Sequence, residues 1–167
     1  KIICDFIFIG NTRNIYRESV KYAIQLGLDI KVIGSGWDKY IDEKYILKDL
    51  VSNSELGSAY MLGRVVLCDH WNDMKKFGFV SNRIYDCLSI GIPILTDYTQ
   101  DIESDLTDEE REYIFTYSSI KDFKEQSQNA LSFSRKIPNQ KNSLDSKYAY
   151  KGLGMIANHI EEILKSH

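Results

Sequence analysis

The sequence contains few cysteines, and they do not suggest a disulfide framework. Only three occur among 167 residues, at Cys4, Cys68 and Cys87. The number is odd, and two of the three stand inside apolar stretches with a strand or helix pattern. We therefore expect reduced, buried thiols of a cytoplasmic protein, because cytosolic proteins keep their cysteines reduced.

An excess of positive charge is also absent. The chain has 21 Lys and Arg against 24 Asp and Glu, which gives a formal net charge of −3. A protein that binds nucleic acid presents a basic face, so nucleic acid is not an expected partner. No apolar run is long enough to cross a bilayer, and no secretory signal is visible, so we expect no membrane span in this chain.

Familiar catalytic and metal-binding motifs are missing as well. The sequence has no Walker-type G-x-x-x-x-G-K-[ST] motif, and no Ser-His-Asp or Cys-His arrangement can be identified in it. The acidic segment 101–112 contains no His or Cys, and Thr107-x-x-Glu110 within it has the pattern of a capping box. We interpret this acidity as a solvated helix and expect no metal site.

The sequence does contain a regular alternation of strand-like and helix-like segments. Its length suits one domain, 1–167, with 43% hydrophobic and 27% charged residues. Short apolar runs predict six strands, at 2–9, 30–33, 45–51, 64–68, 92–96 and 113–117. This order predicts an α/β fold, a Rossmann-like three-layer α/β/α arrangement with a mostly parallel sheet of about six strands.

Several boundaries are predicted from local signals. Ser52-x-x-Glu55 has the pattern of a second capping box, and Gly63 is expected to end the helix that follows it. A polar connector is expected at 139–147, followed by an amphipathic helix at 153–164 that contains a structural His159.

The segment 64–97 organises the chain, because two apolar strands in it flank a polar loop and a helix. The loop follows the carboxyl end of a strand, where open α/β sheets bind ligands. Gly78 lets backbone approach a ligand, and the amides of residues 80–82 would point at an anion from a helix that begins near Ser81. An ordinary capped crossover helix with an exposed Asp86 explains the pattern equally well.

Two loops in the first third of the chain also follow predicted strands. Arg13 and Arg17 come after the turn Gly10-Asn11 and are one helical turn apart, so they can neutralise a diphosphate. A solvated helix face is the alternative, above all for Arg17. The second loop, 34–36, precedes Trp37, which either stacks on a base or covers the sheet edge, and we favour the structural role.

His70 lies in the loop after the fourth predicted strand, between Asp69 and Asp73. A histidine in this position can bind a phosphate or a donor hydroxyl, and that role fits the loop better than a place in the core. His70 and Asp73 are therefore candidate binding residues.

Two motifs in the central segment resemble those of GT-B glycosyltransferases. Residues 78–95 are similar to the donor-site signature G-F-x(5)-[LFY]-E-A-[LM]-A-x-G-x-P-[VI]. The pair D-H-W-x-D-M and S-N-R-x-[FY]-[DE], at 69–74 and 81–86, is similar to a bacterial group 1-like subset related to the CgeB-type glycosyltransferases. The sequence departs from the wider family twice, since Asp86 replaces the second Glu of the E-x(7)-E pair and Gly78 replaces the first.

The resemblance implies the donor-binding half of a hexosyltransferase-like glycosyltransferase whose donor is a nucleotide sugar such as a UDP- or GDP-sugar. It implies transfer to an acceptor such as a cell-surface glycan, with no cofactor and no essential metal. Gly10 matches the glycine that precedes the diphosphate-binding cations of the family, and Arg13, Arg17 or Arg83 would stabilise the departing diphosphate. Asp86 would bind the ribose hydroxyls.

The resemblance also implies an N-terminal domain that this chain lacks, which would hold the acceptor site and any catalytic base. The chain starts at Lys1 and enters a strand almost at once, so we expect a piece of a longer protein, inactive when isolated. The residues expected to bind the nucleotide sugar are Gly10, Asn11, Arg13, Arg17, Gly36, Trp37, His70, Asp73, Gly78, Phe79, Val80, Ser81, Asn82, Arg83 and Asp86.

A non-catalytic nucleotide-binding or regulatory α/β domain is the alternative from another class. A response-regulator-like domain needs an acidic pocket at strand ends and a lysine near the last strand, whereas Asp5 is wrongly placed and Lys121 is only loosely suitable. A degenerate glycosyltransferase that binds its donor without transfer is the second alternative, because Gly78 replaces a family glutamate. Transfer or donor hydrolysis by the full-length protein distinguishes these hypotheses.

Overall fold

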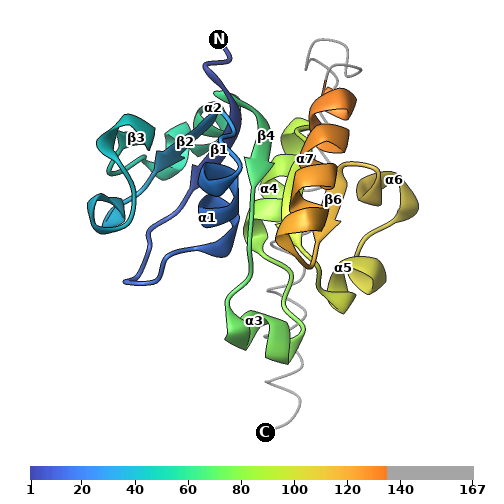
Figure 1. Ribbon diagram of the computed structural model, residues 1–167. Coiled ribbons are helices and arrows are strands. Elements are labelled where there is room, and N and C mark those ends of the chain that lie inside the picture. Colours follow the sequence, from blue (N-terminus) through green and yellow to red (C-terminus); the bar gives the residue numbers. More distant parts are fainter. Residues whose placement is uncertain (135–167) are drawn as a thin grey trace, which may run out of the picture.

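Six parallel strands form one sheet in the order β3-β2-β1-β4-β5-β6 (Figure 1). The structure is a computed structural model that describes residues 1–134. The strands are β1 (Cys4–Ile9), β2 (Ile30–Ile33), β3 (Ile46–Lys48), β4 (Gly63–Leu67), β5 (Ile94–Asp97) and β6 (Ile114–Tyr117). The predicted Rossmann-like α/β fold is confirmed.

Helices cover both faces of this sheet (Figure 1). Helices α1 and α7 pack on one face, and α2 and α4 pack on the other. The α-helices are α1 (Glu18–Gln25), α2 (Leu56–Tyr60), α3 (Asn72–Phe77), α4 (Asn82–Ile90), α5 (Gln100–Asp105), α6 (Asp108–Arg111) and α7 (Ile120–Ser134). Three short 3-10 helices lie at η1 (Trp37–Lys39), η2 (Glu43–Tyr45) and η3 (Asn53–Glu55).

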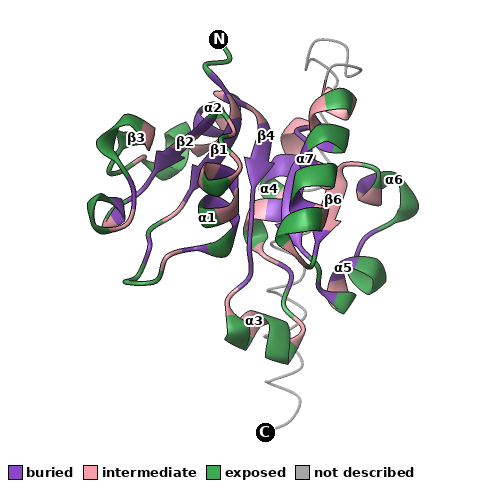
Figure 2. Ribbon diagram, in the orientation of Figure 1, coloured by how far each residue is buried: buried purple, intermediate pink, exposed green. Residues whose placement is uncertain are grey.

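Alternating side chains of the central strands build a core on each face. Phe6 and Phe8 of β1 belong to the cluster under α1 and α7, whereas Ile7 and Ile9 belong to the cluster under α2 and α4. Burial of each such side chain stabilises the fold by roughly 1.5–3 kcal/mol. The four central strands, β1, β2, β4 and β5, are therefore buried along most of their length (Figure 2), as expected for a parallel sheet covered on both faces, whereas the edge strands β3 and β6 are more exposed.

The local predictions agree with the structure in most places. The two capping boxes, Ser52 with Glu55 and Thr107 with Glu110, are both present. The three cysteines are buried free thiols. The acidic segment forms two short helices, α5 and α6, rather than one.

Two predictions about the middle of the chain are wrong. Gly63 does not end α2 but starts β4, where it pairs with Cys4 of β1. The segment expected to be a polar loop before Gly78 contains helix α3, which lies beyond the carboxyl ends of the strands (Figure 1).

The connector expected at 139–147 and the helix expected at 153–164, with His159, lie outside the described residues. None of the helices in residues 1–134 is both long enough and apolar enough to cross a bilayer.

Candidate functional site

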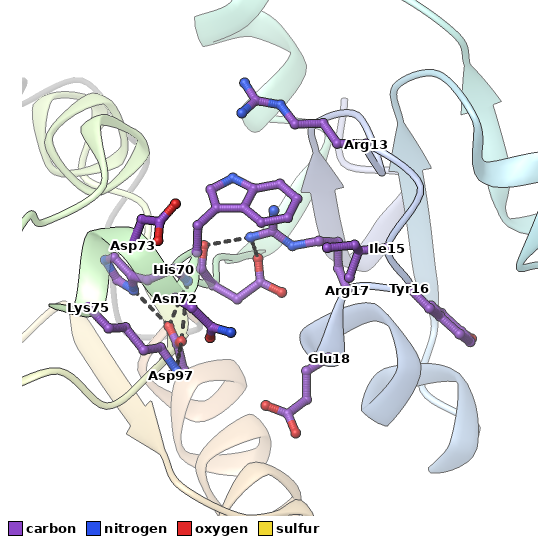
Figure 3. Close-up of a pocket in the computed structure, with 12 residues that line it drawn as sticks. Arg13, Ile15, Tyr16, Arg17, Glu18, His70, Asn72, Asp73, Lys75 and Asp97 are labelled. Carbon is purple, nitrogen blue, oxygen red and sulfur yellow. Dashed lines mark hydrogen bonds and ion pairs between the residues drawn. The ribbon is translucent and has the colours of Figure 1, made fainter.

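The sheet has a switch point between β1 and β4, because the chain runs outward from β1 through β2 to β3 and in the other direction from β4 through β5 to β6. Open α/β sheets bind ligands at such a point. A cavity of about 530 Å³ lies there (Figure 3), within the range of roughly 300–1,000 Å³ that is typical of small-molecule sites. Its lining residues are Arg13, Ile15, Tyr16, Arg17, Glu18, Asp69, His70, Trp71, Asn72, Asp73, Lys75 and Asp97.

The carboxylate of Asp69 occupies the amino terminus of α1. It forms an ion pair with Arg17 and accepts a hydrogen bond from the Ser19 hydroxyl at 3.0 Å and a longer one from the Ser19 amide at 3.5 Å. Arg17 also donates from Nη2 to the Asp69 carbonyl at 2.9 Å, and the side chains of this pair are buried. The amino end of a helix favours an anion, and here the protein supplies that anion itself. The structure thus corrects the expectation that Arg17 is free to meet a diphosphate.

Trp71 brings the two arginines of the β1–α1 loop to the cavity wall. The Arg17 guanidinium lies 3.8 Å from the centre of the Trp71 ring, and that of Arg13 lies 5.5 Å from it. Arg13 is exposed and, like Asn14, has a positive φ, which is uncommon outside glycine. Within residues 1–134, Arg13 has no carboxylate partner. Arg13 is therefore the one lining cation whose charge no ion pair in this region neutralises.

His70 links the end of β5 to the start of α4. Its side chain is fully buried, its Nδ1 lies 2.7 Å from Oδ1 of Asp97, and its Nε2 accepts a hydrogen bond of 3.1 Å from the Ser81 amide. Because Nε2 is the acceptor, Nδ1 carries the proton and donates to Asp97. Both ring nitrogens are thus used within the protein. This corrects the expectation that the His70 ring binds a phosphate or a donor hydroxyl.

Asp97 is the acceptor for a whole group of donors at the carboxyl end of β5. Besides the His70 ring it accepts from the His70 amide at 3.1 Å, and Lys75 of α3 lies 2.6 Å from its Oδ2. Burial raises the pKa of Asp97, but the hydrogen bonds from His70 and Lys75 and the positive charge of Lys75 outweigh burial, so the pKa lies below its ordinary value. Asp97 therefore anchors α3 and the β4–α3 loop as an ionised carboxylate.

Two predicted site residues from distant parts of the chain, Gly10 and Arg83, meet at the carboxyl ends of β1 and β4. A Cβ atom on Gly10 would lie 2.9 Å from Nη2 of Arg83. The Arg83 guanidinium lies 5.0 Å from the centre of the Phe8 ring, and its Nη1 contacts Sγ of Cys68 at 3.6 Å. Gly10 thus leaves room for an arginine that packs into the protein rather than projecting from it.

The predicted anion cradle at 78–82 does not line this cavity. Gly78 has φ of +73° as the residue that ends α3, and a Cβ there would lie 2.8 Å from Oδ1 of Asp101. Val80 is buried in the core, and the amide of Ser81 already donates to His70. The structure therefore corrects two expectations, the close approach of a ligand at Gly78 and a free Ser81 amide.

Three further candidates at this helix are exposed and lie outside the lining of the cavity. Phe79 precedes α4 and is 58% exposed, and Asn82 and Asp86 share the solvent face of α4. Ser81 precedes the helix as predicted, but its side chain makes no capping hydrogen bond.

The loop after β2 packs against the loop after β1. Trp37 is 1% exposed, and its Nε1 donates to the Gly10 carbonyl at 2.8 Å, so it covers the sheet rather than stacking on a base. The side-chain oxygen of Asn11 accepts from the Ser35 amide at 2.8 Å. A Cβ on Gly36, whose φ is +79°, would lie 2.7 Å from Oγ1 of Thr12.

The cavity thus gathers four of the predicted residues, Arg13, Arg17, His70 and Asp73. Sequence analysis missed Asp69, Trp71, Lys75 and Asp97 as parts of the site. Asp97 is the last residue of β5, and Asp69 comes two residues after β4, so their positions at strand ends were the available signal. Residues 1–134 contain no group of three His, Cys, Asp or Glu side chains placed to hold a metal ion.

Comparison with known proteins assigns the chain to a family. The model of a family described as glycosyl transferase-like matches residues 13–140, which include the whole lining of the cavity. Comparison with curated proteins gives no match. Because the family model covers most of its length, the chain belongs to the glycosyl transferase-like family.

Proposed function

We propose that this domain binds the donor of a GT-B glycosyltransferase of the CgeB-like group, a nucleoside-diphosphate sugar. The observation that carries the proposal is the cavity at the switch point between β1 and β4, within the segment that the family model matches. Sheets of this topology bind nucleotides at that point. Membership of a glycosyl transferase-like family supports a sugar nucleotide over other nucleotides.

Electrostatic stabilisation of the leaving diphosphate is the chemistry that this chain's own residues can supply. Arg13 is exposed at the cavity and has no carboxylate partner within the described region, so its guanidinium is available for charge-assisted hydrogen bonds to a phosphate. We propose this role for Arg13 without a metal ion. Asp86, exposed on α4, remains our candidate for the ribose hydroxyls.

We also propose that an N-terminal domain of the same polypeptide completes the enzyme in the cytoplasm of a bacterium, with a cell-surface glycan as acceptor. The isolated chain then binds donor but transfers no sugar. The regulatory alternative gains no support, because Asp5 lies near the start of β1 and is paired with Arg64 at 2.9 Å, far along the strand from the carboxyl edge.

A thermal-shift panel of UDP, GDP, TDP, CDP and ADP tests the proposal, because a ligand that binds the native state raises its apparent stability. The best nucleotide is then titrated calorimetrically against Arg13→Ala and against Lys124→Ala, an exposed cation on α7 that serves as the control. Loss of a charge-assisted hydrogen bond costs about 1.5–3 kcal/mol, so Arg13→Ala should bind the diphosphate roughly 10- to 100-fold more weakly.

The corresponding nucleoside should bind both variants alike, since it has no phosphate. Absence of binding by all five nucleotides would refute the proposed function. Equal affinity of the diphosphate for both variants would refute the proposed role of Arg13 in binding it.

A further inference from the structure

Residues 71–79 form a strap whose two ends are joined by one side chain. The strap runs through α3 and stands beyond the carboxyl ends of the strands (Figure 1). His70 precedes it, Val80 and Ser81 follow it, and the His70 ring accepts a hydrogen bond of 3.1 Å from the Ser81 amide. Compact surface loops of about 6–16 residues whose ends lie close together are Ω-loops, which frequently carry function. The strap has this form, and His70, Val80 and Ser81 are its base.

The base of the strap is fixed to the core. The His70 ring is fully buried and lies 2.7 Å from Oδ1 of Asp97, and the His70 amide donates to the same carboxylate at 3.1 Å. On the other side of the base, Val80 is buried in the cluster under α2 and α4. These contacts involve no residue of the strap itself, so the base can keep its position when the strap moves.

The strap contributes little to the core. None of the six residues of α3, all of which lie in the described part of the chain, is buried, and Phe77 and Phe79 are 65% and 58% exposed. Gly78 ends α3 with a φ of +73°, a conformation that glycine adopts without strain. Segments with few buried apolar contacts open locally at a low free energy. The strap can therefore detach while the rest of the domain stays folded.

Two side chains of the strap contact charged groups of the cavity. The Trp71 ring lies against Arg17, with 3.8 Å from the guanidinium to the ring centre, and Nζ of Lys75 lies 2.6 Å from Oδ2 of Asp97. The Lys75 side chain is 39% exposed, so solvent screens this ion pair and its contribution is small. Residues 71–73 and Lys75 line the cavity (Figure 3). The strap is thus one wall of the cavity, and its position determines how wide the cavity is.

We propose that the strap is a movable wall, which opens away from Arg17 as one unit about its base, and that the ion pair between Lys75 and Asp97 is the latch that holds it closed. Opening separates Trp71 from the Arg17 guanidinium and widens the entrance to the cavity. The motion belongs to the protein without ligand, so the proposal is tested separately from the proposed function.

Two spin labels on the full chain measure the opening. Cysteines replace Phe77 on the strap and Lys21, which is exposed on α1, and the labels attach to these because the native cysteines are buried. Double electron–electron resonance should give two distances, one for the closed and one for the open strap. Lys75→Met should raise the ratio of open to closed strap about two- to fivefold, the effect of a partly exposed ion pair.

Lys76→Met is the matched control. Lys76 is the next residue of the same helix, is exposed, and has no carboxylate partner within residues 1–134. It should therefore leave the ratio as in the wild type. A single distance in all three proteins, or equal ratios in Lys75→Met and Lys76→Met, would show that the inference is wrong.

Acrylamide quenching of tryptophan fluorescence is an independent measurement without labels. The chain has two tryptophans, and Trp37 is 1% exposed, so quenching reports mainly on Trp71. Lys75→Met should increase the quenching constant, whereas Lys76→Met should not. Urea unfolding completes the test: the latch is broken in both the open and the unfolded state, so Lys75→Met should raise the opening and the unfolding constants by the same factor. A rise in the unfolding constant alone would mean that the ion pair stabilises the fold without being the latch, and would overturn the inference.

Discussion

The replacement of His70 by alanine tests how the cavity is held together. The imidazole is fully buried and joins two elements that are far apart in the sequence, since it donates to Asp97 at the end of β5 and accepts from the amide of Ser81 before α4. Alanine removes both bonds at once. It leaves an ionised carboxylate with fewer donors and an amide without its acceptor.

The expected loss follows from the two bonds. A hydrogen bond to a charged group contributes about 1.5–3 kcal/mol, and a buried amide left unpaired costs about 1 kcal/mol or more. We therefore expect His70→Ala to lower the free energy of unfolding by roughly 2.5–4 kcal/mol, out of the 5–15 kcal/mol usual for a domain. In urea, with a slope of about 1–3 kcal/mol per molar, the midpoint should fall by more than about 1 M.

Two further substitutions separate the bonds. Asparagine places an amide donor near the position of Nδ1 and keeps the bond to Asp97, whereas glutamine places an acceptor near the position of Nε2 and keeps the bond to Ser81. Because the bond to Asp97 involves an ionised group, His70→Asn should be more stable than His70→Gln, and both more stable than His70→Ala.

Urea unfolding followed by far-ultraviolet circular dichroism measures this order. A value for His70→Ala within about 1 kcal/mol of the wild type would refute the reasoning, because it would mean that neither bond contributes net stability. A glutamine variant more stable than the asparagine variant would refute the assignment of the stronger bond to Asp97.

Two other predictions concern stability. A Cβ on Gly34 would lie 2.1 Å from the carbonyl oxygen of Gly10, so Gly34→Ala should lower the free energy of unfolding in urea by at least about 3 kcal/mol. Gly27 has open space around it, so Gly27→Ala should cost only the roughly 1–2 kcal/mol of its left-handed backbone. Equal losses in the two variants would contradict the steric argument. The pKa of Asp97 is lowered in the folded state, so its contribution is present above the ordinary aspartate pKa of about 3.9 and is lost as the pH falls through the folded value. Above the ordinary aspartate pKa the wild type should therefore be more stable than Lys75→Ala, and this difference in stability should shrink as the pH falls. Identical stability profiles against pH for the two proteins would show that the Lys75 bond does not lower the pKa of Asp97.

The position of the site could be predicted from local sequence patterns. Apolar runs and helical spacing predict the order of strands and helices, and a polar residue after a strand lies at the carboxyl edge whatever its partners are. His70 and Asp73 were identified in this way and do line the cavity. The helix α3 was missed because its six residues carry no clear apolar face and begin without a capping side chain.

The partners of the charged residues could not be predicted from the sequence. Arg17 and Asp69 are 52 residues apart, and His70 and Asp97 are 27 apart, so no local pattern connects either pair. The spacing of Arg13 and Arg17 suggested two equivalent cations, but only the fold determines that one of them meets a carboxylate. Arg83 was likewise expected at an anion, and its packing against Phe8 depends on contacts between distant segments.

The pairing of Arg17 with Asp69 also determines where an anionic ligand can bind. To reach the amino terminus of α1, a diphosphate would have to displace the Asp69 carboxylate from Arg17 and Ser19. Breaking a buried ion pair costs about 3–5 kcal/mol, whereas a charge-assisted hydrogen bond to Arg13 contributes about 1.5–3 kcal/mol and requires no displacement. If the proposed function is correct, the exposed side of the β1–α1 loop, at Arg13, is therefore a more favourable position for the diphosphate than the amino terminus of α1.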